Sequence, residues 1–170
     1  MILRLAVPAD AMAVARVHVR AWQAAYRGLM PDDYLDGLRA EDRAPRYDFA
    51  GRDPARPRTW VAVEADSILG FAAISPARDE DVTGQGELCA LYVEPDRWGR
   101  GIGRALASEA RSDLSRLGFA RALLWVVAGN ARAEQFYRAD GWSPDGLHRA
   151  RQVGGVTVDT LRYNRLLESP

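Results

Sequence analysis

The segment that most constrains the fold is "ELCALYVEPDRWGRGIGRALASEARSDLSRL", residues 87–117. Residues 87–93 form an apolar run typical of a strand. Apolar residues then recur at steps of three or four, as on one face of a helix: Ile102, Leu106, Ala110, Leu114 and Leu117. Glycines occupy alternate positions of the junction between these two patterns: Gly99, Gly101 and Gly103. The chain therefore places the N-terminus of a long helix directly after a strand, with a glycine turn between them.

Such a turn has the chemistry of an anion site. Glycines let backbone N–H groups approach a ligand, and a helix N-terminus adds partial positive charge. A Walker loop would end in Gly-Lys-Ser/Thr, whereas this turn ends in Gly103-Arg104-Ala105. A dinucleotide-binding turn needs G-x-G-x-x-G and an acidic residue after the next strand, which here ends in Val127-Ala128. A different phosphate ligand, or a plain strand-to-helix corner, remains open.

Patterns elsewhere in the chain predict a mixed α/β fold. Helical spacing begins after Asp10, a predicted N-cap, and ends at Gly28. Further helices are expected at 30–38 and 130–141, with a helical turn at 41–49. Strands are expected at 2–7, 58–65, 67–77, 121–127 and, as a hairpin turning at Gly154-Gly155, within 142–166. The order β-α-α-β-β-β-α-β-α-β-β predicts one domain over residues 1–170, with helices on both faces of a mixed sheet.

Charge and composition exclude several classes of function. The 23 basic and 23 acidic residues give a net charge of zero, so we expect no nucleic-acid partner. Cys89 is the only cysteine, and the two histidines, His18 and His148, form no metal-binding motif, so no metal site is expected. No apolar stretch is long enough to cross a bilayer and the first residues do not resemble a signal peptide. We therefore expect no membrane partner and a cytoplasmic location.

A second motif, "GNARAEQFYRADGW" at residues 129–142, accompanies the glycine turn. Asn130 opens a helix, and Phe136-Tyr137 precede Gly141-Trp142. Together, "RWGRGIGRAL" and this segment resemble the GNAT superfamily of N-acetyltransferases, whose turn has the pattern Gln/Arg-x-x-Gly-x-Gly/Ala. The resemblance covers residues 87–142. Trp98 stands where the family pattern has Gln or Arg, and nothing in the sequence explains this departure.

The resemblance implies a fold and a cofactor. The fold would have a mostly antiparallel central sheet in which strands 87–93 and 121–127 splay apart. The cofactor would be acetyl-CoA, with its pyrophosphate on the amides of the turn and its pantetheine arm along 91–93 and at Asn130. The implied cofactor-binding residues are Leu91, Tyr92, Val93, Trp98, Gly99, Arg100, Gly101, Ile102, Gly103, Arg104, Asn130 and Tyr137.

Acetyl transfer to an amine needs a group that takes the amine proton and a group that protonates or orients the departing thiolate. The resemblance implies Glu87 as the base, at the start of the strand that leads to the cofactor. Alternatively, Glu87 orients a cationic substrate or is a solvated strand end. Tyr137 is implied as the acid, with core packing as the alternative. Cys89 shares side-chain parity with Glu87, but a lone strand cysteine is typically a small core residue.

The first two helices would wall the acceptor site in this family. His18, Trp22 and Tyr26 form one stripe of the first helix, which is also typical of a core face. An acceptor wall would contain Trp22, Tyr26, Met30 and Tyr34, together with Glu87, and would suit an apolar or cationic amine. His148 has no assigned role.

The predicted function is therefore an acetyl-CoA-dependent N-acetyltransferase. Its acceptor would be a small-molecule amine or a peptide N-terminus that attacks directly in a ternary complex, and the protein could form a homodimer. Two alternatives stay open at this point: a non-catalytic acyl-CoA-binding sensor or interaction module, and a transferase of a longer acyl group.

Overall fold

The computed structural model describes residues 1–51 and 56–168. Seven strands form one sheet in the order β1-β2-β3-β4-β5-β7-β6. All neighbouring pairs are antiparallel except β4 with β5. The strands are β1 (Ile2–Leu5), β2 (Arg58–Glu64), β3 (Ser67–Pro76), β4 (Gly86–Val93), β5 (Arg121–Val127), β6 (Ser143–Val153) and β7 (Val156–Leu166).

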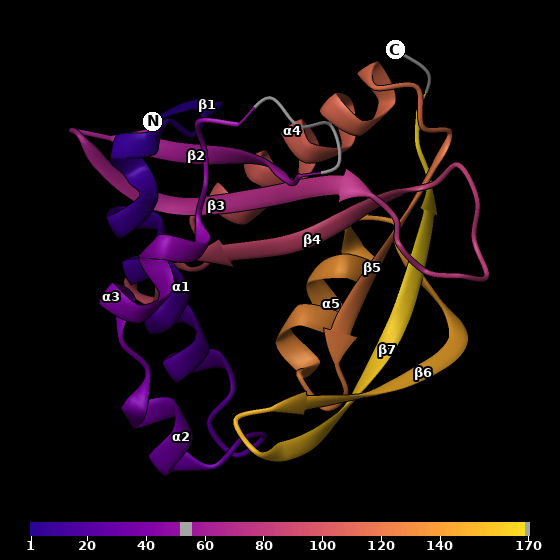
Figure 1. The fold of residues 1–170 in the computed structure, drawn as a ribbon. Coiled ribbons are helices and arrows are strands. Elements are labelled where there is room, and N and C mark those ends of the chain that lie inside the picture. The colour runs from indigo at the N-terminus through magenta and orange to yellow at the C-terminus, as the bar shows by residue number, and fades with distance from the viewer. Residues whose placement is uncertain (52–55, 169–170) are drawn as a thin grey trace.

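Helices cover both faces of this sheet (Figure 1). One face carries α1 (Ala11–Ala25), α2 (Asp32–Gly37) and α3 (Ala40–Arg43), and the other carries α4 (Ile102–Arg116) and α5 (Ala131–Ala139). The alternation of β3 creates the two cores, because Phe71 packs with α1 whereas Ala72 packs with α4. The predicted mixed sheet between two helical layers is confirmed.

The predicted splay between β4 and β5 is also confirmed. The two strands pair only through Gly86 with Ala122 and Glu87 with Leu123. Beyond Glu87, β4 continues to pair with β3, and β5 continues to pair with β7. The sheet therefore opens into a V whose closed end lies at Glu87 and whose open end lies at the glycine turn.

The structure tests two of the helix caps predicted from the sequence. The Asn130 side chain caps α5 by accepting a hydrogen bond from the Ala133 N–H at 3.2 Å, as predicted. The prediction that Asp10 caps α1 is wrong. Its backbone is already helical, and its carboxylate turns back to accept hydrogen bonds from the Val7 N–H at 2.8 Å and from Arg4.

The β6–β7 hairpin reaches across to α2, as Figure 1 shows. The Tyr34 ring contacts the turn so closely that a Cβ added to Gly154 would lie 2.1 Å from a ring carbon. Tyr26, Met30 and Val158 belong to the apolar cluster behind this contact. The hairpin thus ties the second half of the sheet to the first two helices. Among the described residues, no helix is long and apolar enough to cross a membrane.

Candidate active site

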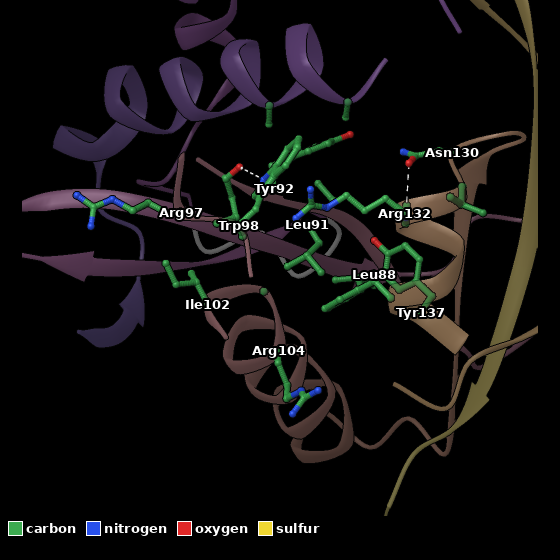
Figure 2. A pocket seen from close by; sticks show the side chains of 18 of the residues that line it. Leu88, Leu91, Tyr92, Arg97, Trp98, Ile102, Arg104, Asn130, Arg132 and Tyr137 are labelled. Carbon is green, nitrogen blue, oxygen red and sulfur yellow. Dashed lines mark hydrogen bonds between the residues drawn. The ribbon is translucent and has the colours of Figure 1, made fainter. Parts of the chain in front are cut away.

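A cleft of about 470 Å³ opens where β4 and β5 diverge (Figure 2). Its walls are β4 from Leu88 to Val93, the glycine turn with the start of α4, the first two turns of α5, and the end of α1. Trp125 and Val126 of β5 complete the lining. The cleft therefore runs from the two predicted motifs to Leu88, and Glu87 lies next to this end of the lining rather than in it.

The glycine turn presents backbone donors without partners. Gly99 and Gly101 adopt φ values of +75° and +83°, a left-handed conformation that favours glycine. A Cβ added at either position would meet no atom within 4 Å, so the surface there is open. In the described part of the chain, the N–H groups of residues 99–104 have no hydrogen-bond acceptor. Free amides at the N-terminus of a 15-residue helix fit a pyrophosphate group.

Arginine side chains make this end of the cleft cationic. Arg97, Arg104 and Arg132 all contribute to the lining. Arg100, by contrast, is exposed and lies outside the lining, so only its backbone belongs to the turn. Guanidinium groups form strong charge-assisted hydrogen bonds with phosphate oxygens. The chemistry of the turn and its surroundings therefore fits the phosphate-bearing part of CoA.

One edge of β4 is available for pairing along the cleft. The Glu94 N–H donates to the Leu69 carbonyl of β3 at 2.8 Å, so Glu94 directs its backbone groups toward β3. Backbone direction alternates along a strand, so the N–H and C=O groups of Leu91 and Val93 face the opposite way, into the gap. The Val93 carbonyl already accepts a hydrogen bond there from Trp98 Nε1 at 2.9 Å. Leu91 is left as the residue whose backbone groups fit a pantetheine amide.

Trp98 now has a structural role. Besides its hydrogen bond to Val93, the indole carries the Arg132 guanidinium over its face, 3.8 Å from the ring centroid. Figure 2 shows Arg132 extending from α5 across the cleft to Trp98. Sequence reasoning missed Arg132, although its position in the first turn of α5, beside Asn130, was an available signal. Trp98 and Arg132 thus connect the glycine turn with α5 across the cleft, at the position where the GNAT pattern has one Gln or Arg side chain.

Asn130 has a divided role at the same end of α5. Its Oδ1 atom is used as the helix cap, and its side-chain NH₂ group has no partner among the described residues. Asn130 lines the cleft, so this NH₂ group is a donor available to a bound molecule. Its predicted contact with the pantetheine arm would use Nδ2 rather than Oδ1.

Glu87 lies at the closed end of the V, where β4 still pairs with β5. Burial raises the pKa of its carboxyl, and the negative charge of Asp79 raises it further. The cations Arg151, Arg149 and Arg78 act in the opposite direction but do not reverse the shift. A half-buried carboxylate with a raised pKa is suited to take a proton.

The network around Asp79 was not predicted from the sequence. Asp79 is 7% exposed and accepts hydrogen bonds from Trp125 Nε1 at 3.1 Å, from Arg149 at 3.0 Å and from Arg162 at 3.1 Å. Arg162 also pairs with Asp81 at 2.7 Å. These bonds fasten the β3–β4 connection to the far half of the sheet beside Glu87. The only available signal was a run of acids in a segment otherwise typical of a polar turn.

Tyr137 combines the two roles considered for it. Its ring packs edge-on against Trp142, with centroids 6.3 Å apart, whereas its side chain also lines the cleft. Figure 2 shows the hydroxyl pointing from α5 toward β4. Burial raises the pKa of Tyr137 above its ordinary value, and Tyr92 and Asp140 raise it further. The hydroxyl therefore stays protonated and able to donate.

The residues that were predicted to line the acceptor site lie in two different places in the structure. Tyr26 lines the cleft and contacts Trp22 edge-on, with centroids 5.1 Å apart. The Trp22 Nε1 atom is buried without a partner among the described residues. Met30, 5% exposed, and Tyr34 lie instead in the apolar cluster beneath the β6–β7 hairpin. Tyr26 is thus the member of this set that directly faces the cleft.

The two histidines occupy different environments. His18 is 5% exposed, and its Nδ1 atom hydrogen-bonds with the Tyr47 hydroxyl at 2.6 Å. Burial lowers the pKa of His18 to about 2, and Arg43 contributes to that decrease, so His18 is neutral at physiological pH. His148 lies on the surface, with Nδ1 2.9 Å from Asp159 Oδ2. In residues 1–51 and 56–168, no group of three or more potential ligands could hold a metal ion.

Cys89 lies in the cleft with solvent-accessible surface, although protein surrounds it on most sides. Its sulfur is 3.2 Å from Ser75 Oγ. Burial, with the nearby Glu87 charge, raises the pKa of the Cys89 thiol to about 11. At neutral pH the group is therefore a thiol, the less nucleophilic form.

A family model and a related protein sequence both match this chain to the same family. A model of the acetyltransferase (GNAT) family matches residues 20–142. The uncharacterized N-acetyltransferase YuaI of Bacillus subtilis is 33% identical over 153 residues, which cover 88% of this chain and 83% of that protein.

Solved structures agree with these sequence matches. The ribosomal-protein-alanine N-acetyltransferase of Brucella melitensis superposes with a TM-score of 0.75 at 25% identity, over 98% of this chain and 100% of that one. YncA of Salmonella typhimurium, solved with its cofactor acetyl-CoA, gives a TM-score of 0.73 at 19% identity, over 100% of this chain and 95% of that one. The splayed sheet is therefore a fold shared with these proteins.

Proposed function

The chain belongs to the GNAT family of acetyltransferases, and from this premise we propose that it transfers an acetyl group to a primary amine of a small molecule or peptide N-terminus. It is an acyltransferase that uses acetyl-CoA. We propose, besides this acceptor class, that the amine attacks acetyl-CoA directly while both substrates are bound.

One observation supports the proposal: a single cleft runs from the free amides of the glycine turn along β4 to Leu88, the residue next to Glu87. The open edge of β4 thus leads from the anion-binding glycine turn toward Glu87, the residue proposed to accept a proton. The two ends match the two requirements of the reaction, which are to hold a phosphate-bearing donor and to deprotonate an amine.

The residues that would hold acetyl-CoA follow from the donors present in the cleft. The amides of residues 99–104 and the guanidinium groups of Arg97, Arg104 and Arg132 would bind the pyrophosphate region. Leu91 and the Asn130 NH₂ group would bind the pantetheine amides. When bound, acetyl-CoA supplies a thioester whose carbonyl carbon is electrophilic.

Two side chains would move protons. Glu87 would accept a proton from the ammonium form of the acceptor, directly or through water, and so free the nitrogen lone pair for attack. As the new C–N bond forms and the C–S bond breaks, the Tyr137 hydroxyl would donate its proton to the departing sulfur. The attacking nitrogen would at the same stage lose its second proton to solvent, and solvent would return a proton to Tyr137. The raised pKa of Glu87 makes it a stronger base than an ordinary carboxylate, and the raised pKa of Tyr137 means that its hydroxyl carries a proton before the reaction.

Direct attack is favoured over an acyl-enzyme route. Cys89 is the only cysteine of the chain, and its raised pKa keeps it protonated. A thiol of this kind is a poor competitor for the thioester carbon. The amine is therefore the proposed nucleophile.

The test is release of CoA thiol from acetyl-CoA in the presence of a broad panel of primary amines, with CoA binding measured in parallel by calorimetry. We expect CoA to bind without any acceptor and at least one class of amine to accelerate thiol release. Binding of CoA with no amine-dependent release across the panel would contradict the proposed acceptor class.

A further inference from the structure

The β6–β7 hairpin faces the first two helices across the acceptor side of the sheet. Its tip lies beside α2 in Figure 1, where the Tyr34 ring contacts Gly154. Val153 and Val158 join Tyr26 in the apolar cluster behind that contact. Side chains on this inner face of the hairpin therefore border the space beside Tyr26.

Arg151 lies on that inner face of β6. It pairs with Val158 of β7, and residues directly opposite in an antiparallel ladder project to the same side. On the same side of β6, Arg149 stacks over Trp125 at 4.2 Å, whereas Val153 packs in the apolar cluster. Trp125 lines the cleft, so Arg151 is flanked by the cleft wall and by the cluster.

Glu87 projects to the same face of the sheet. It pairs with Leu123 of β5, and Trp125 shares the parity of Leu123. The charge of Arg151 reaches both Glu87 and Tyr26, where it opposes the increase in pKa caused by burial. The positive charge of Arg151 therefore acts on the candidate base and on the acceptor wall from the same face of the sheet.

The other arginines of this face are already engaged. Arg149 pairs with Asp79 at 3.0 Å, and Arg162 is held by Asp79, Asp81 and Asp145. Arg151 is exposed, with no hydrogen bond, ion pair or ring contact to any residue in the described ranges 1–51 and 56–168. Its guanidinium is available to a bound molecule.

We infer that Arg151 binds a carboxylate of the acceptor and so selects amines that carry a carboxylate near the amino group, as amino acids do. This inference rests on the proposed acetyl transfer. A guanidinium group matches a carboxylate through two parallel N–H···O hydrogen bonds. With the carboxylate at Arg151, the amino group would face Glu87, and the remainder of the acceptor would lie against Tyr26. An N-terminal peptide residue without this charge would lose the contact.

The experiment measures thiol release from acetyl-CoA with amino acids and with the carboxamides of the same amino acids. Wild type is compared with Arg151→Gln, with Arg151→Lys, and with Arg121→Gln, which removes an exposed arginine at the first residue of β5. We expect wild type to prefer each carboxylate over its carboxamide by about tenfold or more in kcat/KM. Arg151→Gln should abolish the preference by raising KM for the carboxylates, and Arg151→Lys should restore part of it. Arg121→Gln should retain the preference.

The possible results distinguish a failure of the proposed role of Arg151 from a failure of the proposed acetyl transfer. Equal turnover of carboxylates and carboxamides by wild type, or an unchanged preference in Arg151→Gln, would overturn the role of Arg151 and leave acetyl transfer standing. An absence of thiol release with every amine, while CoA still binds, would overturn both. An unchanged KM for acetyl-CoA in Arg151→Gln would verify that the variant is folded.

Discussion

Glu87 and Tyr137 are single residues whose proton affinity is increased by burial. Their positions at the closed end of the V and on α5 allow each to act on a different substrate. The two proposed roles can be tested separately, because Glu87 would act only after it has lost its proton, whereas Tyr137 would act only while it still has a proton to donate.

Glu87 should impose a pH dependence on the reaction. It acts as a base only when ionised, and its raised pKa shifts ionisation to higher pH, so kcat/KM should rise as pH increases through a value above that of an ordinary glutamate. Glu87→Gln should remove this limb and lower kcat/KM by about 100-fold or more. Glu80→Gln, an exposed glutamate of the β3–β4 connection, is the matched control. A Glu87→Gln variant with the wild-type profile would rule out the base.

Tyr137→Phe should lower kcat by about 100-fold, with a small effect on KM for acetyl-CoA. The substitution keeps the ring that packs on Trp142 and removes only the donor. Tyr163→Phe is the control, because that hydroxyl bonds with Glu134 at 3.2 Å and does not line the cleft. Steady-state kinetics of both variants provide the comparison, and an unchanged kcat in Tyr137→Phe would refute the acid role.

Among the elements, α5 contacts the turn before α4 at the end of the cleft where we propose that acetyl-CoA binds. Trp98→Ala removes a hydrogen bond to Val93 and the surface on which Arg132 lies. We expect Kd for CoA to increase by about 30-fold, since the two interactions contribute about 1 kcal/mol each. Trp98→Phe, which keeps an aromatic face, should give an intermediate value.

A double-mutant cycle makes this prediction specific. If Trp98 acts by holding Arg132, the effects of Trp98→Ala and Arg132→Ala on Kd should be smaller together than their sum. Calorimetric titration of CoA into the four proteins measures the coupling. Strictly additive effects would show that the two side chains act independently.

The structural elements differ in how well they could be predicted from the sequence. The glycine turn and the Asn130 helix were predictable because their signals are local, involving backbone conformation and a cap three residues from its partner. Arg132 on Trp98 was not, since the pairing depends on how far β4 and β5 diverge. Met30 and Tyr34 were predicted to line the acceptor site, but in the structure they pack beneath the tip of the β6–β7 hairpin. The hydrophobic periodicity of the sequence does not show how this hairpin curls.

At the scale of the whole molecule, the two halves of the sheet share few ladder bonds, so other contacts must join them. Arg162 is one such contact, buried and paired with carboxylates on the β3–β4 connection and on β6. Arg162→Met leaves Asp79 buried with fewer partners and should lower the free energy of unfolding by about 3 kcal/mol. Urea denaturation measures this loss, and Arg121→Met serves as the exposed control. Equal stability of the two variants would refute the joining role.

If the amine attacks acetyl-CoA directly, both substrates must occupy the cleft at the same time. Initial velocities measured while both substrate concentrations are varied test this requirement. We expect lines that intersect in a double-reciprocal plot, and no acetyl group on Cys89 by mass spectrometry after incubation with acetyl-CoA alone. Parallel lines together with acetylated Cys89 would contradict it, because they would place an acyl-enzyme between the two substrates.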